Sequence, residues 1–318
     1  MPKISVIVCE RNSEKFIEDC VNSIMNQSFK DFELIIVHTA STDSTKEKII
    51  ELQKKYSIKL IELKKNGISR ARNTGIKNAL GELIAFTDSD CVVEKNWLEE
   101  LIKGFDEKTV SVGGPNLVPV NADKKEKIFD ELLELISGIG SSYVKNSEKI
   151  IEVKHNPTCN SIYTKKILAE MNGFNEKLSS NEDPELDYRI KKTDQKIKFN
   201  PKAIVFHNRK NSMKKIFDQA FWFGLGRTQA IKLHLGMIEW FRIIPLISIM
   251  LILFLFLHGI YSADFNFLFY FITLLFSGFI LISLIAVIKF KRFSLNYFFF
   301  LISWFFGYGF GMLKGVIK

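Results

Sequence analysis

Residues 83–90, LIAFTDSD, are the most informative segment for the fold, because a strand-like run leads directly into two aspartates. A short, continuous apolar run bounded by turn residues is typical of a strand buried on both faces of a parallel sheet. Asp88 and Asp90 then follow the carboxyl end of that strand, where open α/β sheets bind their ligands. Two carboxylates at this place suit a divalent cation, Mg²⁺ or Mn²⁺, that bridges a diphosphate. A turn with two solvated acids is the alternative.

Strand-like and helical patterns alternate in the residues before this segment. The expected strands are 3–9, 32–37 and 58–63, and the expected helices are about 16–24, 46–56 and 69–80. Short connections between alternating strands and helices predict a doubly wound, mostly parallel α/β sheet. Because the chain opens directly into a strand, we expect no cleavable signal peptide. The four cysteines have no metal-binding spacing and are expected to be buried and reduced.

Apolar residues are concentrated at the carboxyl end of the chain, which has 318 residues. Residues 241–318 hold 17 of the 29 phenylalanines but only six Lys or Arg residues and one acid. They divide into three apolar segments, 243–260, 265–288 and 293–313. Each is long enough for a membrane span, which needs ~20 residues, so an ordinary water-soluble protein is excluded. We expect three crossings; two are the alternative, because glycines in the third segment permit a bent, re-entrant course.

Basic charge is concentrated next to these segments. Residues 1–201 hold 31 basic and 32 acidic side chains, whereas residues 202–236 hold seven basic side chains and one acid. The net charge of +9 is therefore not a general nucleic-acid charge, and we expect no nucleic-acid partner. A basic belt beside apolar segments suits anionic lipids or a phosphorylated lipid. Basic residues at 289–292 predict that this connector faces the cytoplasm together with the N-terminal domain.

Residues 211–240 combine an apolar face with basic residues and two tryptophans. This composition predicts an amphipathic helix that lies along the membrane surface. Trp240, at the entry to the first apolar segment, fits the aromatic belt of a membrane protein. An ordinary packing helix of the preceding domain is the alternative.

Several further motifs stand around the two aspartates in one order along the chain. They are Ser23-Ile24-Met25-Asn26-Gln27, Ser41-Thr42-Asp43-Ser44-Thr45, residues 66–75 (NGISRARNTG), Gly173-Phe174, Glu182-Asp183, Leu186-Asp187 and Arg189. With this ordered set, residues 3–210 resemble the family 2 glycosyltransferases. The resemblance implies the GT-A fold, a Rossmann-like, doubly wound and mostly parallel sheet, followed here by a C-terminal α-helical membrane segment. It also implies a nucleotide-sugar donor and an inverting reaction.

The resemblance divides the chain into three regions. Residues 1–210 are expected to form the GT-A catalytic domain, with a nucleotide-sugar-binding part at 1–115 and an acceptor part at 116–210. Residues 211–240 are expected to form the amphipathic interfacial helix. Residues 241–318 are expected to form a transmembrane region of two or three helices.

The resemblance also assigns roles to side chains. It implies that Asp183 is the general base and that Glu182 orients it or the acceptor, whereas acids capping a helix are the alternative. It implies that Asp90 and His207 hold a divalent metal, Mn²⁺ or Mg²⁺, although His207 could simply be a strand-end histidine. The residues expected at the nucleotide sugar are Asn12, Thr39, Asp43, Arg70, Arg72, Asp88 and Ser89. The two arginines could instead pair with carboxylates at the sheet edge.

Together these expectations describe an integral membrane glycosyltransferase with a cytoplasmic catalytic domain and a lipid-linked acceptor, such as a polyprenyl (di)phosphate or an oligosaccharide built on one. A UDP-sugar is the favoured donor and a GDP-sugar remains open, because His38 and Thr39 stand where the family usually has acidic residues. A catalytically silent sugar-binding subunit of a glycan-assembly complex is one alternative. A processive polysaccharide synthase is another. The sugar, the acceptor and the oligomeric state stay open.

Overall fold

The computed structural model describes residues 1–136 and 148–317. The strands in chain order are β1 (Ile4–Glu10), β2 (Phe32–Thr39), β3 (Ile58–Leu63), β4 (Leu83–Asp88), β5 (Cys91–Val93), β6 (Thr109–Gly113), β7 (Asn116–Leu117), β8 (Ile151–Glu152), β9 (Asn160–Thr164), β10 (Lys196–Phe199) and β11 (Val205–His207). The helices are α1 (Ile17–Met25), α2 (Thr45–Gln53), α3 (Ile68–Asn78), α4 (Trp97–Ile102), α5 (Lys124–Ile136), α6 (Lys165–Glu170), α7 (Glu182–Ile190), α8 (Met213–Leu233), the 3₁₀ helix η1 (Leu235–Met237), α9 (Trp240–Ser262), α10 (Asn266–Phe290) and α11 (Asn296–Ile317).

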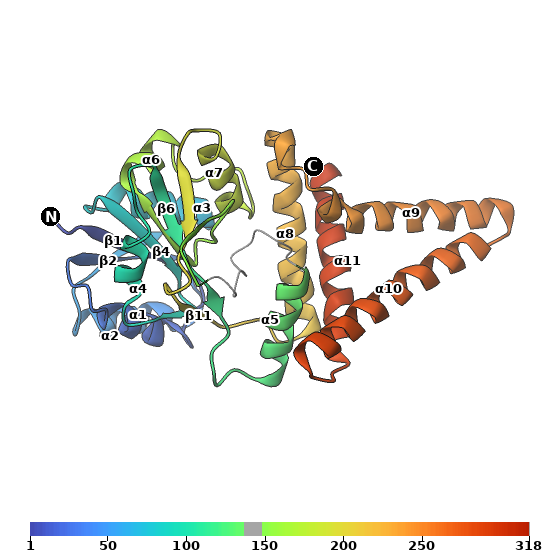
Figure 1. Ribbon diagram of the computed structural model, residues 1–318, viewed down its shortest axis with the longest axis horizontal. Coiled ribbons are helices and arrows are strands. Elements are labelled where there is room, and N and C mark those ends of the chain that lie inside the picture. The colour runs from blue at the N-terminus through green and yellow to red at the C-terminus, as the bar shows by residue number, and fades with distance from the viewer. Residues whose placement is uncertain (137–147, 318) are drawn as a thin grey trace. The chain divides into compact units, whose positions relative to one another are not determined.

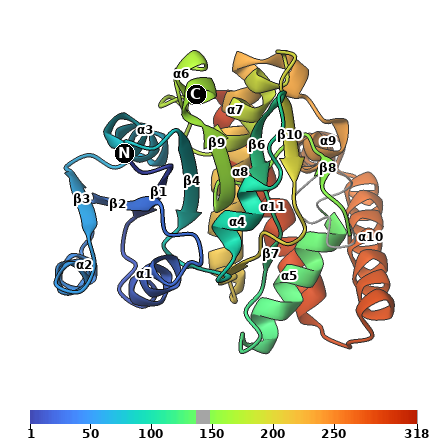
Figure 2. The same cartoon turned by 60° about the vertical axis from the view of Figure 1, so that its left-hand side comes forward.

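An eight-stranded sheet organises the N-terminal part of the chain. Its order is β3-β2-β1-β4-β9-β6-β10-β8, which Figure 2 shows from left to right. The first four strands of that order are parallel to one another, and β6 is parallel to β10. The antiparallel exceptions are β9, between β4 and β6, and β8 at the edge. The prediction of a doubly wound, mostly parallel sheet is confirmed.

Helices cover both faces of this sheet because its strands are apolar on both sides. On β1, Ile4, Val6 and Val8 pack into a core with α1, α2 and α4. Ile7 points the other way, into a second core with α3, α6 and α7. Successive strand residues face opposite sides of a sheet, so one continuous apolar run supplies two cores.

A small second sheet lies beyond the end of β4. Its order is β5-β11-β7, with β11 antiparallel to β5 and parallel to β7. The pairing sets His207 opposite Cys91, directly after Asp90. Two segments separated by more than 100 residues in sequence therefore meet at the carboxyl end of β4.

The chain divides into two compact units. Among the described residues, one comprises 1–120, 148–177 and 182–208, and the other comprises 121–136, 178–181 and 209–317. Residues 121–136 thus join the C-terminal helices, although they lie inside the region 1–210 expected as the catalytic domain. The reason is the apolar face of α5, where Phe129 packs its ring against Phe300 and Trp304 of α11.

The second unit is helical. α9 and α10 form a hairpin that extends to one side of the paired helices α8 and α11, with α5 beside them (Figure 1). Three of the described helices, α9, α10 and α11, are long and apolar enough to cross a membrane. Large apolar side chains are exposed along α9 and α10 on all sides. This region is that of a membrane protein.

Candidate active site

The polar residues at the end of β4 form the centre of the candidate site. Asp88 is the last residue of the strand, and its side chain is one-third exposed. Ser89 is buried, and its hydroxyl lies 2.6 Å from that of Ser13 in the loop after β1. Asp90 accepts two hydrogen bonds at its backbone oxygen from Asn208, which follows β11. Hydrogen bonds to two other segments therefore fix the turn that presents the aspartates.

A buried ion cluster connects Asp88 to α7. The guanidinium of Arg72 on α3 lies 3.5 Å from the Asp88 carboxylate and pairs with the carboxylate of Glu182. The Arg72 side chain also lies over the Phe174 ring. Of the two roles left open from the sequence, pairing with a sheet-edge carboxylate is what the structure shows for Arg72. Glu182 holds this arginine in the same cluster.

Burial changes the proton affinity of the acids in this cluster. It raises the pKa of Asp88 to about 7, while the charge of Arg72 acts in the opposite direction. Burial likewise raises the pKa of Glu182, again opposed by Arg72. Carboxyl groups with raised pKa values at the end of a sheet are typical of functional sites. A cation bound beside Asp88 would favour its charged form.

The second aspartate forms a separate group with the small sheet. The Asp90 carboxylate lies 3.3 Å from Nε2 of His207, and the ligand atoms of Asp90, Cys91 and His207 all lie within 4.8 Å of one another. A carboxylate oxygen and an imidazole nitrogen at this separation fit the ligand chemistry of Mn²⁺. The structure therefore brings together Asp90 and His207, the two residues expected to hold the metal.

His207 is strongly biased toward its protonated form when no cation is bound. Burial disfavours the imidazolium, but the charge and hydrogen bond of Asp90 outweigh burial and raise the His207 pKa to about 10. A metal ligand must present an unprotonated nitrogen, so a cation would have to displace this proton. Metal binding at this place should therefore release a proton.

A third group surrounds Asp183 at the start of α7. Its carboxylate accepts a long hydrogen bond of 3.4 Å from the backbone N–H of Thr158 and lies 3.8 Å from Nε2 of His155. The other ring nitrogen of His155, Nδ1, lies 2.7 Å from the carboxylate of Asp187. Because a carboxylate only accepts hydrogen bonds, Nδ1 carries the proton of that contact. Asp183 keeps part of its carboxylate exposed, as a group that acts on a substrate must.

Asp187 is a further residue of the candidate site, to which the sequence motif Leu186-Asp187 assigned no role. Its side chain is fully buried and also accepts hydrogen bonds from the backbone of Asn156 and the hydroxyl of Tyr163. The available signal was its helical position, one turn after Asp183. An acid there lies on the same face of the helix.

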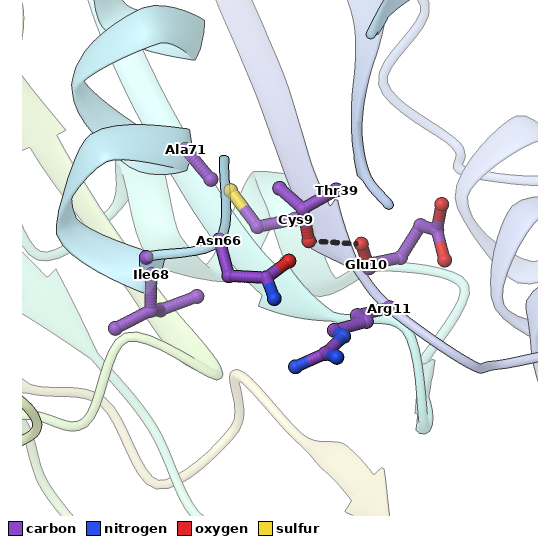
Figure 3. Close-up of a pocket in the computed structure, with 8 residues that line it drawn as sticks. Cys9, Glu10, Arg11, Thr39, Asn66, Ile68 and Ala71 are labelled. Carbon is purple, nitrogen blue, oxygen red and sulfur yellow. Dashed lines mark hydrogen bonds between the residues drawn. The ribbon is translucent and has the colours of Figure 1, made fainter. Parts of the chain in front are cut away.

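A pocket opens at the ends of β1 and β2 beside the start of α3 (Figure 3). Its lining comprises Cys9, Glu10, Arg11, Thr39, Asn66, Gly67, Ile68 and Ala71. The Thr39 hydroxyl donates to the backbone oxygen of Glu10. Thr39, one of the residues expected at the nucleotide sugar, is therefore among those that line this pocket.

Glu10 and His38 are paired residues on neighbouring strands, and their side chains are in direct contact. The sequence offers no acid at the end of β2, where family members usually have one. In the structure, Glu10 brings a carboxylate to this place from the adjacent strand. The sequence could not show this, because only the strand register sets Glu10 beside His38.

Three residues expected at the nucleotide sugar contact other parts of the chain in the structure, and their contact with a donor stays a prediction. The Asn12 side chain accepts from the backbone of Thr42, and Asp43 accepts from the backbone of Thr45 at the start of α2. Arg70 is exposed and pairs with Glu176. These contacts tie loops at the sheet edge together, and none of the three residues lines the pocket.

Comparisons with known proteins agree with this arrangement. The model of the family described as "Glycosyl transferase family 2" matches residues 5–171. The GalNAc(5)-diNAcBac-PP-undecaprenol beta-1,3-glucosyltransferase of Campylobacter jejuni is 31% identical over 185 residues, which are 57% of this chain and 58% of that protein. The chain spans less than two thirds of the length of the curated relatives it matches.

Solved structures show the same fold. A mannosyltransferase from Pyrobaculum calidifontis in complex with GDP-Man and Mn²⁺ has a TM-score of 0.56 at 18% identity, covering 73% of this chain and 64% of that one. Staphylococcus aureus TarS 1-349 in complex with UDP-GlcNAc has a TM-score of 0.50 at 24% identity, covering 71% and 66%. These likenesses establish the GT-A fold. Because the family model covers more than half of the chain, including β4 and its two aspartates, the protein belongs to glycosyl transferase family 2.

Proposed function

We propose that this protein is an inverting glycosyltransferase that moves a sugar from a nucleotide diphosphate sugar to a lipid-linked acceptor. The observation that carries the proposal is the grouping of Asp90 with His207 beside the cluster of Asp88, Arg72 and Glu182. The membership of the chain in glycosyl transferase family 2 supports the same reading. Asp183, on the same helix as Glu182, then supplies the base.

Inversion requires one in-line displacement at the anomeric carbon of the donor sugar. One base and a stabilised leaving group are therefore sufficient. Asp183 takes the proton of the acceptor hydroxyl, while the Thr158 backbone N–H holds its carboxylate in place. Asp187 fixes the orientation of His155 through Nδ1. An acceptor that is already a phosphate anion depends less on this base.

The leaving group is a nucleoside diphosphate, and its charge must be offset. Mn²⁺ or Mg²⁺ bound by Asp90 and His207 would offset that charge as the sugar departs. Asp88 would face the ribose or diphosphate, held in orientation by Arg72. The pocket lined by Thr39 and Glu10 would hold the nucleobase of the donor.

The structural neighbours of this fold support a nucleotide diphosphate sugar as the donor class. Both ligand-bound structures described above carry nucleotide diphosphate sugars, one a UDP-sugar and one a GDP-sugar. We favour a UDP-sugar as donor. Glu10 is held by His38 and Ser41, and it is the residue through which this chain would discriminate among nucleobases.

The acceptor is proposed to be a polyprenyl (di)phosphate or an oligosaccharide linked to one. The relative from Campylobacter jejuni carries an undecaprenol-linked glycan in its name. The apolar helices of the second unit would keep the enzyme at the membrane that contains such a lipid. The catalytic unit is proposed to face the cytoplasm, where nucleotide sugars are made.

A donor screen tests this function. Membranes containing the protein are incubated with single radiolabelled nucleotide sugars, Mn²⁺ or Mg²⁺ and a membrane lipid extract, and the label in the organic phase is counted. We expect one donor to label the lipid phase, with loss of label in Asp183→Asn and after chelation of the metal. Label only in water-soluble products contradicts the lipid acceptor. No turnover with any donor favours a silent sugar-binding subunit, and long products on a gel favour a processive synthase.

A further inference from the structure

Two helices separated by a hairpin lie side by side in the second unit. α8 and α11 are in contact along most of α8, and the contacting residues advance in the same direction along both helices. The paired positions are Phe217 with Gly307, Phe221 with Gly311, Thr228 with Gly315 and Lys232 with Val316. The two helices are therefore parallel.

The contact is close because the facing residues are small. A Cβ atom added to Gly311 would lie 2.0 Å from the backbone oxygen of Phe221, and one added to Gly224 would lie 2.0 Å from that of Tyr308. Small residues four apart on each helix allow the two backbones to touch. The Thr228 hydroxyl, 3.3 Å from the Met312 backbone oxygen, adds a polar contact to the same seam.

The shared direction of α8 and α11 restricts how the chain can cross a membrane. Consecutive crossing helices alternate in direction, so α8 and α11, with two helices between them, would be antiparallel if all four crossed. They are parallel. A crossing by α11 alone is also excluded, because α8 accompanies it side by side for several turns. If α9 and α10 both cross, as their length and apolar surface favour, α8 and α11 must both lie on one side of the membrane.

The chemistry of the helices agrees with this division. The most apolar 18-residue stretches of α9 and α10 have mean hydropathies of 2.6 and 2.7, and 17% of each stretch is buried within the protein. The corresponding stretch of α11 has a mean hydropathy of 1.4 and is 50% buried. α8 carries Asp218 and Arg227 among its apolar residues. A charged side chain near the centre of a bilayer is strongly unfavourable.

The ends of the hairpin fit the same division. At the carboxyl end of α10, Lys289 pairs with Glu134 and Arg292 lies 3.4 Å from Glu131, both on α5. The opposite end, at residues 263–265, carries no basic residue. Basic connectors remain on the cytoplasmic side and uncharged or acidic connectors are translocated.

We propose that only α9 and α10 span the bilayer, and that α8 and α11 lie together along its surface against anionic lipid headgroups. Lys214, Lys215 and Lys232 on α8 and Lys314 on α11 are exposed and supply the positive charge. Trp222, Phe310 and Val316 are exposed apolar residues of the same two helices. An apolar side combined with basic residues is the composition of helices that bind in the interface. This arrangement builds on the proposed function, since it would hold the catalyst at the surface that contains its acceptor.

Labelling from each side of the membrane tests the number of crossings. Sealed vesicles of both orientations carry the full protein with one added cysteine, at Lys3, at Ala263 or in a short tag after Lys318, and a maleimide that does not cross membranes is applied. We expect the tag and Lys3→Cys to be labelled from the same side, and Ala263→Cys from the other side. A tag labelled only from the side of Ala263→Cys overturns the proposal. Labelling needs no turnover, so an inactive enzyme leaves this result readable.

Hydrogen exchange tests the lipid partner. The purified protein is placed in nanodiscs of phosphatidylcholine alone or with phosphatidylglycerol. We expect amides of α8 and the last turns of α11 to exchange roughly fivefold more slowly with the anionic lipid, since each basic residue near such a surface contributes about 1 kcal/mol. Equal exchange in both discs contradicts the anionic partner. Lys214→Gln with Lys215→Gln should remove the difference, whereas Lys30→Gln, in the other unit, should keep it.

Discussion

The edge of the eight-stranded sheet and the α8–α11 seam are held together in opposite ways. At the sheet edge, charged side chains such as Arg72 and Glu182 occupy buried positions and neutralise one another. At the seam, the essential feature is the absence of a side chain, because backbones touch at Gly311 and Gly224. The first region holds buried charge at the candidate site, and the second brings two helices together. Substitutions should therefore act through charge at the sheet edge and through side-chain volume at the seam.

The largest effect is expected at Asp183, which lies at the sheet-edge site but holds little structure. Asp183→Asn keeps the size of the side chain and removes its ability to take a proton. Transfer to a hydroxyl acceptor should fall by about 10²–10⁴-fold, the usual contribution of a general base. The melting temperature should stay close to that of the parent protein. An Asp183→Asn variant that transfers sugar at the parent rate would show that Asp183 is not the general base.

Glu182 should show the reverse behaviour, although it is the adjacent residue. Glu182→Gln removes the charge that Arg72 faces and leaves a buried guanidinium with Asp88 as its remaining acid. Breaking a buried pair in this way costs about 3 kcal/mol of unfolding free energy. Denaturant unfolding of the two variants side by side measures the difference. Equal stability of the Glu182→Gln and Asp183→Asn variants would show that the Arg72–Glu182 pair does not stabilise the sheet edge.

The seam is expected to respond to volume rather than charge. Gly311→Leu places a side chain against the Phe221 backbone, and overpacking of this kind costs about 1–3 kcal/mol. Gly278→Leu on α10 is the matched control, because nothing lies within 4 Å of a Cβ added there. Thermal unfolding in detergent should separate the two variants. A seam that tolerates leucine at Gly311 contradicts the close helix contact.

Metal binding at the sheet edge should depend on pH. The pKa of His207 is raised to about 10 by Asp90, so at neutral pH the cation must displace a proton. Affinity for Mn²⁺ should therefore rise with pH, by about tenfold per unit for one displaced proton, and level off near the His207 pKa. Calorimetry in buffers of different ionisation enthalpy counts the released protons. His207→Gln should bind more weakly and lose the pH dependence; an unchanged pH dependence would place the proton elsewhere.

The smallest effect is expected at Arg70. Its ion pair with Glu176 is exposed on both sides, and such pairs contribute about 0–1 kcal/mol. Arg70→Ala should change the rate and the donor KM by less than about threefold. A loss of donor binding beyond that range would support the contact between Arg70 and the nucleotide sugar that is expected from the sequence.

Local pattern was sufficient to predict the central part of the fold. The strands at β1 to β4 and the helices between them lie close to their expected bounds, because continuous apolar runs and helical spacing have a direct local cause. The family resemblance also implied that Asp90 and His207 act together, and their side chains are close in the structure. The hydrogen bonds of Asn12 and Asp43 were not predictable in this way, because their partners are set by the fold, and the nucleotide-sugar role of both residues stays a prediction.

Composition, hydrophobic period and residue order predict an α/β domain with aspartates at a strand end, followed by helices apolar enough for a membrane. These features can be recognised without knowing which residues are in contact. The contact of Glu182 with Arg72, the partial exposure of its neighbour Asp183 and the parallel course of α8 and α11 became visible only in the folded chain. These are relations between residues far apart in the chain, so strand register and helix packing set them, and no local pattern contains them.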